Sequence, residues 1–303
     1  MSDLFTKAAG LVYLMRPAEW TKSIGNMLIA VIVAHYMFNL DIDFLNLFYG
    51  MVSVCFLWSA LYTVNDIFDK GVDALHPIKK KRPLPSGDVS INLAKLLVAV
   101  LLAISFWIGF NLGTLFLICL IVMVTNQTLY TIKPFNFKKR PIVDLISGSA
   151  INPIFRFYSG WVLLTQAFNA PLLPLVFIVG LQFGGFCLYR MSSKNLEDEL
   201  GYRSSVVLFG EKNLMILSYI AITLGAISFI LMTLTGLEYL QGLKDWGYLP
   251  LKYNWLIVLS LLTFPLYRQA LKDPKKIDMA KVYRIIYIHL LLFIVGFVAL
   301  YFL

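Results

Sequence analysis

The chain has 303 residues, of which 59% are hydrophobic and only 14% are charged, and its mean hydropathy is +0.76. Soluble domains have about a quarter of their residues charged, so the composition excludes an ordinary globular enzyme and indicates a polytopic membrane protein. The net charge of +9 does not by itself indicate that the protein binds nucleic acid. In a membrane protein, Lys and Arg orient the helices and face anionic lipid, so we expect no nucleic-acid partner.

Nine apolar stretches are long enough to cross a bilayer, since each crossing requires roughly 20 residues. In chain order, the predicted spans are about 24–39, 45–64, 92–111, 113–131, 142–162, 170–189, 213–236, 253–267 and 284–303. Because unpaired backbone groups cannot face lipid, all nine are expected to be helices. The chain is therefore predicted to be an all-α membrane protein that forms a single domain over residues 1–303.

The positive charges give an independent prediction of orientation. With a cytoplasmic N-terminus, every Lys and Arg lies on the inner side except Lys244 and Lys252, which lie outside, and Arg156, which lies within a span. This asymmetry is what the positive-inside rule predicts. We expect an integral protein of a bacterial inner membrane, with the N-terminus inside, the C-terminus outside and the functional site facing the cytoplasm.

The second span is followed by a segment rich in acidic and basic residues, NDIFDKGVDALHPIKKKRPLPSG at 65–87. Asp66, Asp69 and Asp73 are three and four residues apart, so a helix places their carboxylates on one face. Mg²⁺ relieves the repulsion of such acids and characteristically binds carboxylates together with substrate phosphates. The basic run that follows suits the remaining phosphate oxygens. The predicted catalytic and metal-binding residues are Asp66, Asp69 and Asp73, and the predicted substrate-binding residues of this run are Lys79 and Arg82.

Two further polar segments flank the predicted spans. Before the first span, Arg16 and Lys22 either mark the headgroup level or reach an anionic lipid or substrate. After the fourth span, Tyr130 and Lys133 lie at i and i+3 and can reach inward. The neighbouring pair 138–139 is interpreted as an orientation signal only.

A third polar segment follows the sixth span. Arg190, Lys194 and Asp198 are spaced by four residues, with Glu197 adjacent. They form either a second stripe that faces the site or an exposed surface helix held by i,i+4 pairs. Arg190 and Lys194 are included as candidate substrate-binding residues.

Arg156 is unusual because it lies inside the fifth predicted span. It is roughly 18 Å along the helix from Asp144, at the standard rise per residue. A charge within the bilayer costs several kcal/mol and is a candidate for function. Arg156 therefore either binds substrate or forms a buried pair with an acid on another helix.

These motifs together resemble the UbiA superfamily of intramembrane prenyltransferases. The resemblance rests on N-D-x-x-D-x-x-x-D at 65–73, on R-P-L-P-S-G at 82–87 and on the nine predicted spans. It implies a helical bundle around a central cavity that opens to lipid. It also implies that Mg²⁺ binds the first acidic motif, with Asn65 contributing beside the three aspartates.

A narrower resemblance concerns the substrate. Family members that act on prenyl diphosphates usually carry a second motif, D-x-x-x-D, after the sixth span, and this chain has no such motif there. The chain is more similar to the branch of decaprenyl-phosphate phosphoribosyltransferases, through R-P-x-x-W-x-K at 16–22, H-P-x-K-x-x-R-P at 76–83 and R-x-x-x-G at 156–160. The Lys-Arg pair of that branch corresponds here to Tyr189-Arg190, an imperfect match.

The resemblance to this branch implies Mg²⁺-dependent transfer of a phosphoribosyl group from phosphoribosyl pyrophosphate to a polyprenyl phosphate in the membrane. One alternative keeps the fold and transfers a prenyl group from a prenyl diphosphate to an aromatic acceptor, with Glu197 and Asp198 as a degenerate second motif. A remote alternative is a transporter that uses buried charges as an ion path. The expected partners are a polyprenyl lipid, a phosphorylated sugar or prenyl diphosphate, and membrane lipids.

Overall fold

The computed structural model describes residues 2–75, 79–234, 248–262 and 279–303, and within these ranges the chain is helical and has no strands. The longer helices are α1 Ser2–Met15, α2 Trp20–Phe38, α3 Phe44–Leu75, α5 Ile91–Leu112, α6 Thr114–Thr131, α8 Asn152–Thr165, α9 Leu172–Met191, α11 Ser205–Met232 and α13 Met279–Phe302. The short α-helices are α4 Pro83–Ser86, α7 Val143–Ile146 and α10 Lys194–Glu199. The 3₁₀ and π elements are η1 Pro17–Glu19, η2 Lys79–Lys81, η3 Phe137–Lys139, η4 Ser147–Ile151 and η6 Leu251–Leu262.

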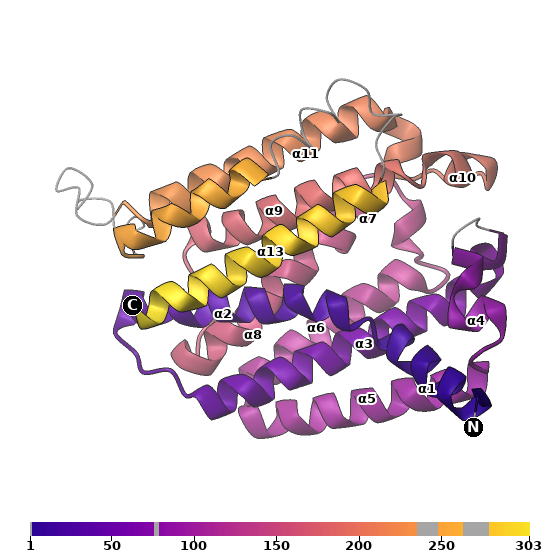
Figure 1. Cartoon of the computed structure of the whole chain (residues 1–303), viewed down its shortest axis with the longest axis horizontal. Coiled ribbons are helices and arrows are strands. Elements are labelled where there is room, and N and C mark those ends of the chain that lie inside the picture. The colour runs from indigo at the N-terminus through magenta and orange to yellow at the C-terminus, as the bar shows by residue number, and fades with distance from the viewer. Residues whose placement is uncertain (1, 76–78, 235–247, 263–278) are drawn as a thin grey trace.

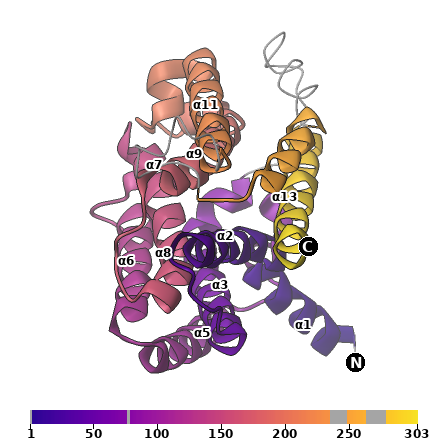
Figure 2. The same ribbon diagram turned by 90° about the vertical axis from the view of Figure 1, so that its left-hand side faces the viewer.

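The long helices form a bundle in which most run side by side (Figure 1). An end-on view shows α2, α3 and α8 near the centre, with α5, α6, α9, α11 and α13 around them (Figure 2). The largest helix interfaces join α9 to α11, α3 to α5 and α2 to α8. Side chains of α2 from Met27 to Ala34 are almost all buried, so this helix lies at the core of the molecule. A cavity at the centre of the bundle stays a prediction.

Seven helices of the described chain are long and apolar enough to cross a membrane, and they correspond to seven of the nine predicted spans. The predicted fifth span is a helical run over 143–165 that is interrupted by the π turn η4. The predicted eighth span is a 3₁₀ helix as far as Leu262, and its last residues, 263–267, lie outside the described ranges. The chain is an integral membrane protein, while nine crossings and a cytoplasmic N-terminus stay predictions.

Two glycines shape the bundle. Gly113 has a φ of 114°, a conformation that side chains rarely adopt, and it alone connects α5 to α6. Gly160 lies where α8 crosses α2, and a Cβ atom there would come within 2.5 Å of the carbonyl oxygen of Met27. The close approach of these two helices fixes the position of the α8 side chains that face α3.

Candidate active site

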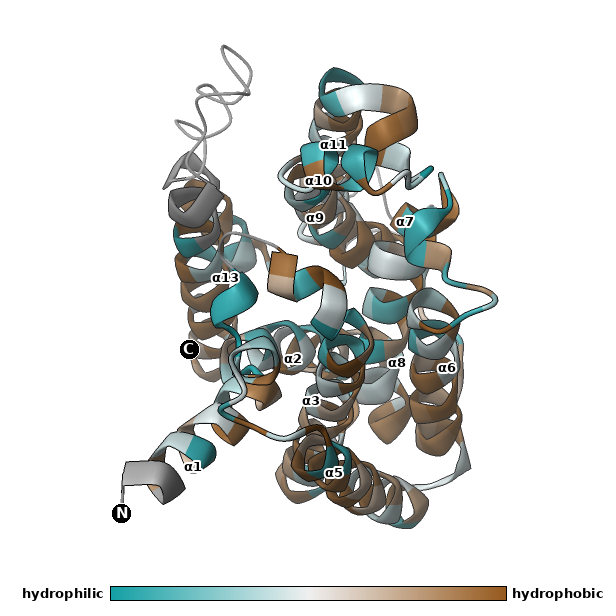
Figure 3. Ribbon diagram, turned by 90° about the vertical axis from the view of Figure 1, so that its right-hand side faces the viewer, coloured by the Kyte–Doolittle hydropathy of each residue, from teal (hydrophilic) through white to brown (hydrophobic). Residues whose placement is uncertain are grey.

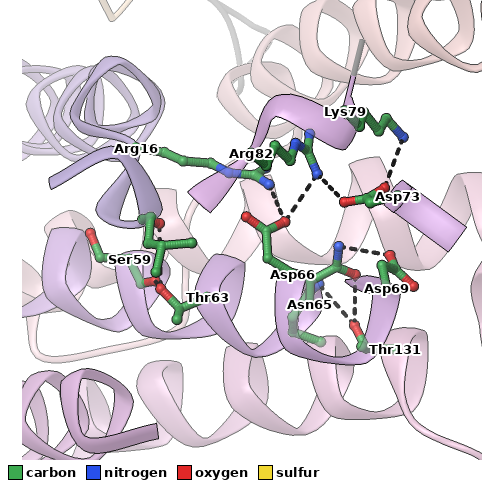
Figure 4. A network of polar contacts seen from close by, with 12 residues as sticks. Arg16, Ser59, Thr63, Asn65, Asp66, Asp69, Asp73, Lys79, Arg82 and Thr131 are labelled. Carbon is green, nitrogen blue, oxygen red and sulfur yellow. Dashed lines mark hydrogen bonds and ion pairs between the residues drawn. The ribbon is translucent and has the colours of Figure 1, made fainter. Parts of the chain in front are cut away.

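The acidic motif lies on α3 itself, because this helix continues past the predicted span as far as Leu75. Asp66, Asp69 and Asp73 therefore share one helical surface, as their spacing predicted, and Figure 4 shows them among basic side chains. The C-terminal part of α3, which carries them, lies at the end of the bundle where α4 and α10 are found (Figure 1). Figure 3 looks onto this end and shows a hydrophilic segment at α10, whereas α5 and α6 are mostly hydrophobic.

Asp66 is the most buried of the three acids, with 1% of its surface exposed. Its Oδ1 accepts hydrogen bonds from Arg16 and from Arg82, the latter over 3.1 Å. Arg16 separates α1 from α2 in a left-handed conformation, with φ of 50°. Such backbone strain in a non-glycine residue is often found at functional sites. The other carboxylate oxygen, Oδ2, is buried and has no hydrogen-bond partner in the described part of the chain.

Asp73 is held by the basic run that follows α3. Arg82 Nη1 donates to Asp73 Oδ2 over 2.8 Å, and Lys79 Nζ lies 3.9 Å from Asp73 Oδ1. The turn η2 brings the two cations back over the helix end, where the backbone N–H of Arg82 donates to the carbonyl of Lys79. Arg82 thus bridges Asp66 and Asp73 with one guanidinium group.

Asp69 is held from a different part of the chain. Lys138 of η3 donates to Asp69 Oδ1, and Asn65 Nδ2 donates to Asp69 Oδ2 over 3.0 Å. Thr131, at the end of α6, donates to the side-chain oxygen of Asn65 over 3.2 Å. The sequence interpretation treated Lys138 as an orientation signal, and its place beside the acids was missed.

The donor set at this site is suited to a hard cation such as Mg²⁺, because it consists of carboxylate and amide oxygens. The unpartnered Oδ2 of Asp66 fits such an ion. In the residues that the structure describes, however, no three acidic, His or Cys side chains converge closely enough to hold a metal. Each acid instead contacts a basic side chain, so a metal at this site has to displace some of these ion pairs. The metal-binding role of the three aspartates stays a prediction.

A second polar cluster joins the loops at the same end of the bundle. Arg190, at the end of α9, donates to Glu197 over 2.8 Å and to Asp144 over 3.3 Å. It also donates to the backbone carbonyl of Lys138 over 3.2 Å, which connects this cluster to Asp69. Ser204 donates to Glu197, and burial raises the pKa of Glu197 although Arg190 and this hydrogen bond oppose the shift. These contacts indicate that Arg190 positions the η3 loop.

A third polar group lies beside the acids, one helical turn further into the bundle. Glu19 accepts hydrogen bonds from Lys22 over 2.6 Å, from Tyr62 over 3.3 Å and from Tyr287 of α13. Arg156 donates to the hydroxyl of Tyr62 over 3.3 Å. This group therefore joins residues from α2, α3, α8 and α13.

The predicted site residues are not all together. Those brought together at the acidic motif are Arg16, Asn65, Asp66, Asp69, Asp73, Lys79 and Arg82. Lys22 and Arg156 lie in the adjacent group, and Tyr130 is close to Arg190. Lys133 is exposed and Lys194 is half-buried. The motif residues His76 and Pro77 lie outside the described ranges.

Besides Lys138, sequence reasoning missed the parts played by Tyr62 and Tyr287. Glu19 was visible as the acid between two candidate cations, Arg16 and Lys22. No local pattern marks Tyr287, which is 268 residues away from its partner Glu19.

Comparison with known proteins extends these observations. The chain is 27% identical over 219 residues to a decaprenyl-phosphate phosphoribosyltransferase of Mycolicibacterium smegmatis, a match that covers 66% of this chain and 65% of that relative. It is also 27% identical over 202 residues to a 4-hydroxybenzoate octaprenyltransferase of Providencia stuartii, covering 60% of this chain and 66% of the relative. Among solved structures, a UbiA homolog from Archaeoglobus fulgidus bound to GPP and Mg²⁺ superposes with a TM-score of 0.72 at 19% identity, over 97% of this chain and 100% of that one.

The chain spans less than two thirds of the length of these first curated relatives, and the structural likeness establishes the fold alone. The family is established by a model of the UbiA prenyltransferase family, which matches residues 26–290 and so covers most of the chain. The chain therefore belongs to the UbiA prenyltransferase family.

Proposed function

We propose that the protein is a Mg²⁺-dependent intramembrane transferase that moves a phosphoribosyl group from phosphoribosyl pyrophosphate to a polyprenyl phosphate. The observation that carries this proposal is the gathering of Arg16, Arg82, Lys79 and Lys138 around a single acidic motif. Two phosphorylated substrates that meet in one site bring many negative charges, and these require cations beyond the metal. The similarity to a decaprenyl-phosphate phosphoribosyltransferase supports the same choice.

In this proposal the acidic motif holds the diphosphate of the donor. A bound Mg²⁺ supplies Lewis-acid stabilisation for the charge that develops on the leaving diphosphate. Asp66 and Asp73 would hold the ion, and Arg82 and Lys79, which now pair with these carboxylates, would exchange them for phosphate oxygens. Both cations already lie against the acids, so they are present at the site when the donor binds, although the metal has to displace some of their ion pairs.

The transfer step itself exchanges one C–O bond for another. An oxygen of the acceptor phosphate forms a bond to the anomeric carbon of the ribose, while the bond from that carbon to the diphosphate breaks. The diphosphate leaves with the electron pair, and the carbon passes through an oxocarbenium-like state, as in other glycosyl transfers. The acceptor phosphate is already ionised, so the protein has to position it rather than remove a proton.

A second candidate is prenyl transfer from a prenyl diphosphate to an aromatic acceptor. The equal identity to a 4-hydroxybenzoate octaprenyltransferase favours it. Against it, Glu197 is engaged by Arg190 and Ser204, and Asp198 is exposed, so these acids are poorly suited to replace a second metal-binding motif. Membership of a transferase family favours both candidates over a transporter.

A transfer assay separates the two candidates. Purified full-length protein in lipid nanodiscs is given labelled phosphoribosyl pyrophosphate with a polyprenyl phosphate, or labelled geranyl diphosphate with 4-hydroxybenzoate, each with Mg²⁺ or with a chelator. We expect Mg²⁺-dependent labelled lipid in the first reaction only. Product in the second reaction alone would overturn the phosphoribosyl assignment.

The matched variants of this assay are Asp66→Asn and Lys95→Gln. Asp66 lies in the proposed metal site, whereas Lys95 is an exposed cation of α5. We expect Asp66→Asn to lower the turnover by at least about 100-fold, because an electrostatic partner of the transition state is lost, and Lys95→Gln to leave turnover unchanged. Equal turnover in the two variants would contradict the role given to Asp66.

A further inference from the structure

Arg156 differs in its partners from the other cations near the site. Arg16 is paired with Asp66, Lys22 with Glu19, and Arg190 with Asp144 and Glu197. Arg156 has only 4% of its surface exposed, yet it forms no ion pair with an acid in the described part of the chain. The buried acid pair that was one interpretation of its sequence position is therefore not found among those residues.

The contacts of Arg156 leave much of its guanidinium group available to a ligand. One face lies over the ring of Trp58, with the central carbon 3.7 Å from the ring centroid. Nη2 donates to the hydroxyl of Tyr62 over 3.3 Å, while Nε is buried and has no hydrogen-bond partner among the described residues. A cation–π contact recovers part of the cost of burying a charge, but it satisfies none of the N–H donors in the plane of the group.

The position of Arg156 relative to the acidic motif is set by α3. Along α3, Tyr62 lies one helical turn before Asp66, and Trp58 lies two turns before Asp66. The guanidinium group of Arg156, which contacts both, therefore lies about 6–12 Å along the helix from the acids. Arg16 connects the two places, because it pairs with Asp66 and its guanidinium carbon lies 5.0 Å from the ring centroid of Tyr62. An anion at Arg156 would therefore be next to the proposed diphosphate and deeper in the apolar bundle.

From these observations we infer that Arg156, with Trp58 and Tyr62, binds the anionic phosphate head of the acceptor lipid. This inference rests on the proposed function and names the place where the second substrate binds. The planar fork of an arginine donates two parallel N–H bonds to one phosphate group, and Trp58 holds that fork in a fixed plane. An acceptor held there lies one or two turns from the acids, and the ribose of the donor has to bridge this separation, because attack on the anomeric carbon requires the reacting atoms to be about 3–3.5 Å apart.

Equilibrium binding tests the inference without relying on turnover. Full-length protein in nanodiscs is titrated with farnesyl phosphate, with farnesol as the uncharged analogue, with inorganic phosphate and with 4-hydroxybenzoate. We expect farnesyl phosphate to bind at least tenfold more tightly than farnesol and than inorganic phosphate. The preference over farnesol should disappear in Arg156→Gln and persist in Lys95→Gln, the control at an exposed cation.

Two further measurements keep the result independent of folding and of the proposed reaction. Arg156→Lys retains the charge but not the fork, so we expect it to fold and to bind farnesyl phosphate at least threefold more weakly. Mg²⁺-dependent binding of pyrophosphate should be the same in both Arg156 variants as in the natural protein. If the transfer assay gives no product but the preference for farnesyl phosphate over farnesol depends on Arg156, the proposed reaction is wrong and the anion site at Arg156 is still supported.

Several outcomes would overturn the inference. The first is a preference for farnesyl phosphate that persists in Arg156→Gln, or that is unchanged in Arg156→Lys. The second is equally tight binding of inorganic phosphate, which would exclude a lipid-specific site. The third is Arg156-dependent binding of 4-hydroxybenzoate without binding of farnesyl phosphate, which would assign this place to an aromatic carboxylate.

Discussion

At the scale of single residues, the basic side chains at the acidic motif act as internal counter-ions. Asp66 and Asp73 share Arg82, whose Nη1 lies 3.1 Å and 2.8 Å from their carboxylates. Two buried carboxylates that share one guanidinium group would repel each other if Arg82 were removed. The arrangement therefore stabilises the ligand-free protein and holds in place the groups that the proposed function assigns to phosphate.

Replacement of Arg82 by Gln tests this role. With a chelator present, we expect the free energy of unfolding to fall by on the order of 1–3 kcal/mol, and the unfolding midpoint to fall with it. The buried acids lose a charged hydrogen-bond donor, although Asp66 keeps Arg16. Added Mg²⁺ should recover more stability in this variant than in the natural protein. Lys81→Gln, at an exposed neighbour in the same run, is the control, and an equal midpoint for the two variants would refute the role of Arg82.

The positions of some site residues could be predicted from the sequence, and those of others could not. The common face of Asp66, Asp69 and Asp73 follows from helical spacing alone, and α3 confirmed it. Lys138 could not be chosen over Lys139, because the choice depends on tertiary contacts: Arg190 fixes the backbone of Lys138, and Lys139 stacks on Tyr202 at 3.7 Å.

At the scale of elements, the fifth predicted span illustrates what hydropathy leaves out. The sequence predicted a uniform helix, but a π turn occupies Ser147–Ile151. Asn126 of α6 donates to the carbonyl of Ser147 over 2.8 Å, and Asn152 donates to the same oxygen over 3.3 Å. Side chains that bond a helix carbonyl disturb its i→i+4 ladder, and π turns are frequent at functional sites. Asp144 before this turn contacts the loops, whereas Arg156 after it contacts α3.

The contact between α8 and α2 gives a second test at this scale. Gly160→Ala should destabilise the protein by about 1–3 kcal/mol, because the added methyl group would overlap the backbone of Met27. Gly185→Ala in α9 is the matched control, since its Cβ would meet nothing within 4 Å and alanine favours a helix. Thermal unfolding in nanodiscs measures both, and a Gly160 variant as stable as the Gly185 variant would contradict the close crossing.

At the scale of the whole molecule, the composition alone indicated an all-helical membrane protein, and the motifs indicated the family. Seven spans were placed by hydropathy because lipid-facing helices are uniformly apolar, and exposed side chains such as Trp107 and Phe110 of α5 still show this. The arrangement of the helices could not be predicted in the same way. Contacts such as that between Glu19 of η1 and Tyr287 of α13 join opposite ends of the chain, and no periodic pattern encodes them.

The central feature of the proposed function is the binding of a divalent cation together with a diphosphate by the acids of α3. Calorimetric titration of pyrophosphate into the full-length protein, with and without Mg²⁺, tests this directly. We expect saturable binding that requires Mg²⁺, that weakens by at least about tenfold in Asp66→Asn and Asp73→Asn, and that is unchanged in Lys95→Gln. Binding of equal strength without Mg²⁺, or in both Asp variants, would contradict the claim.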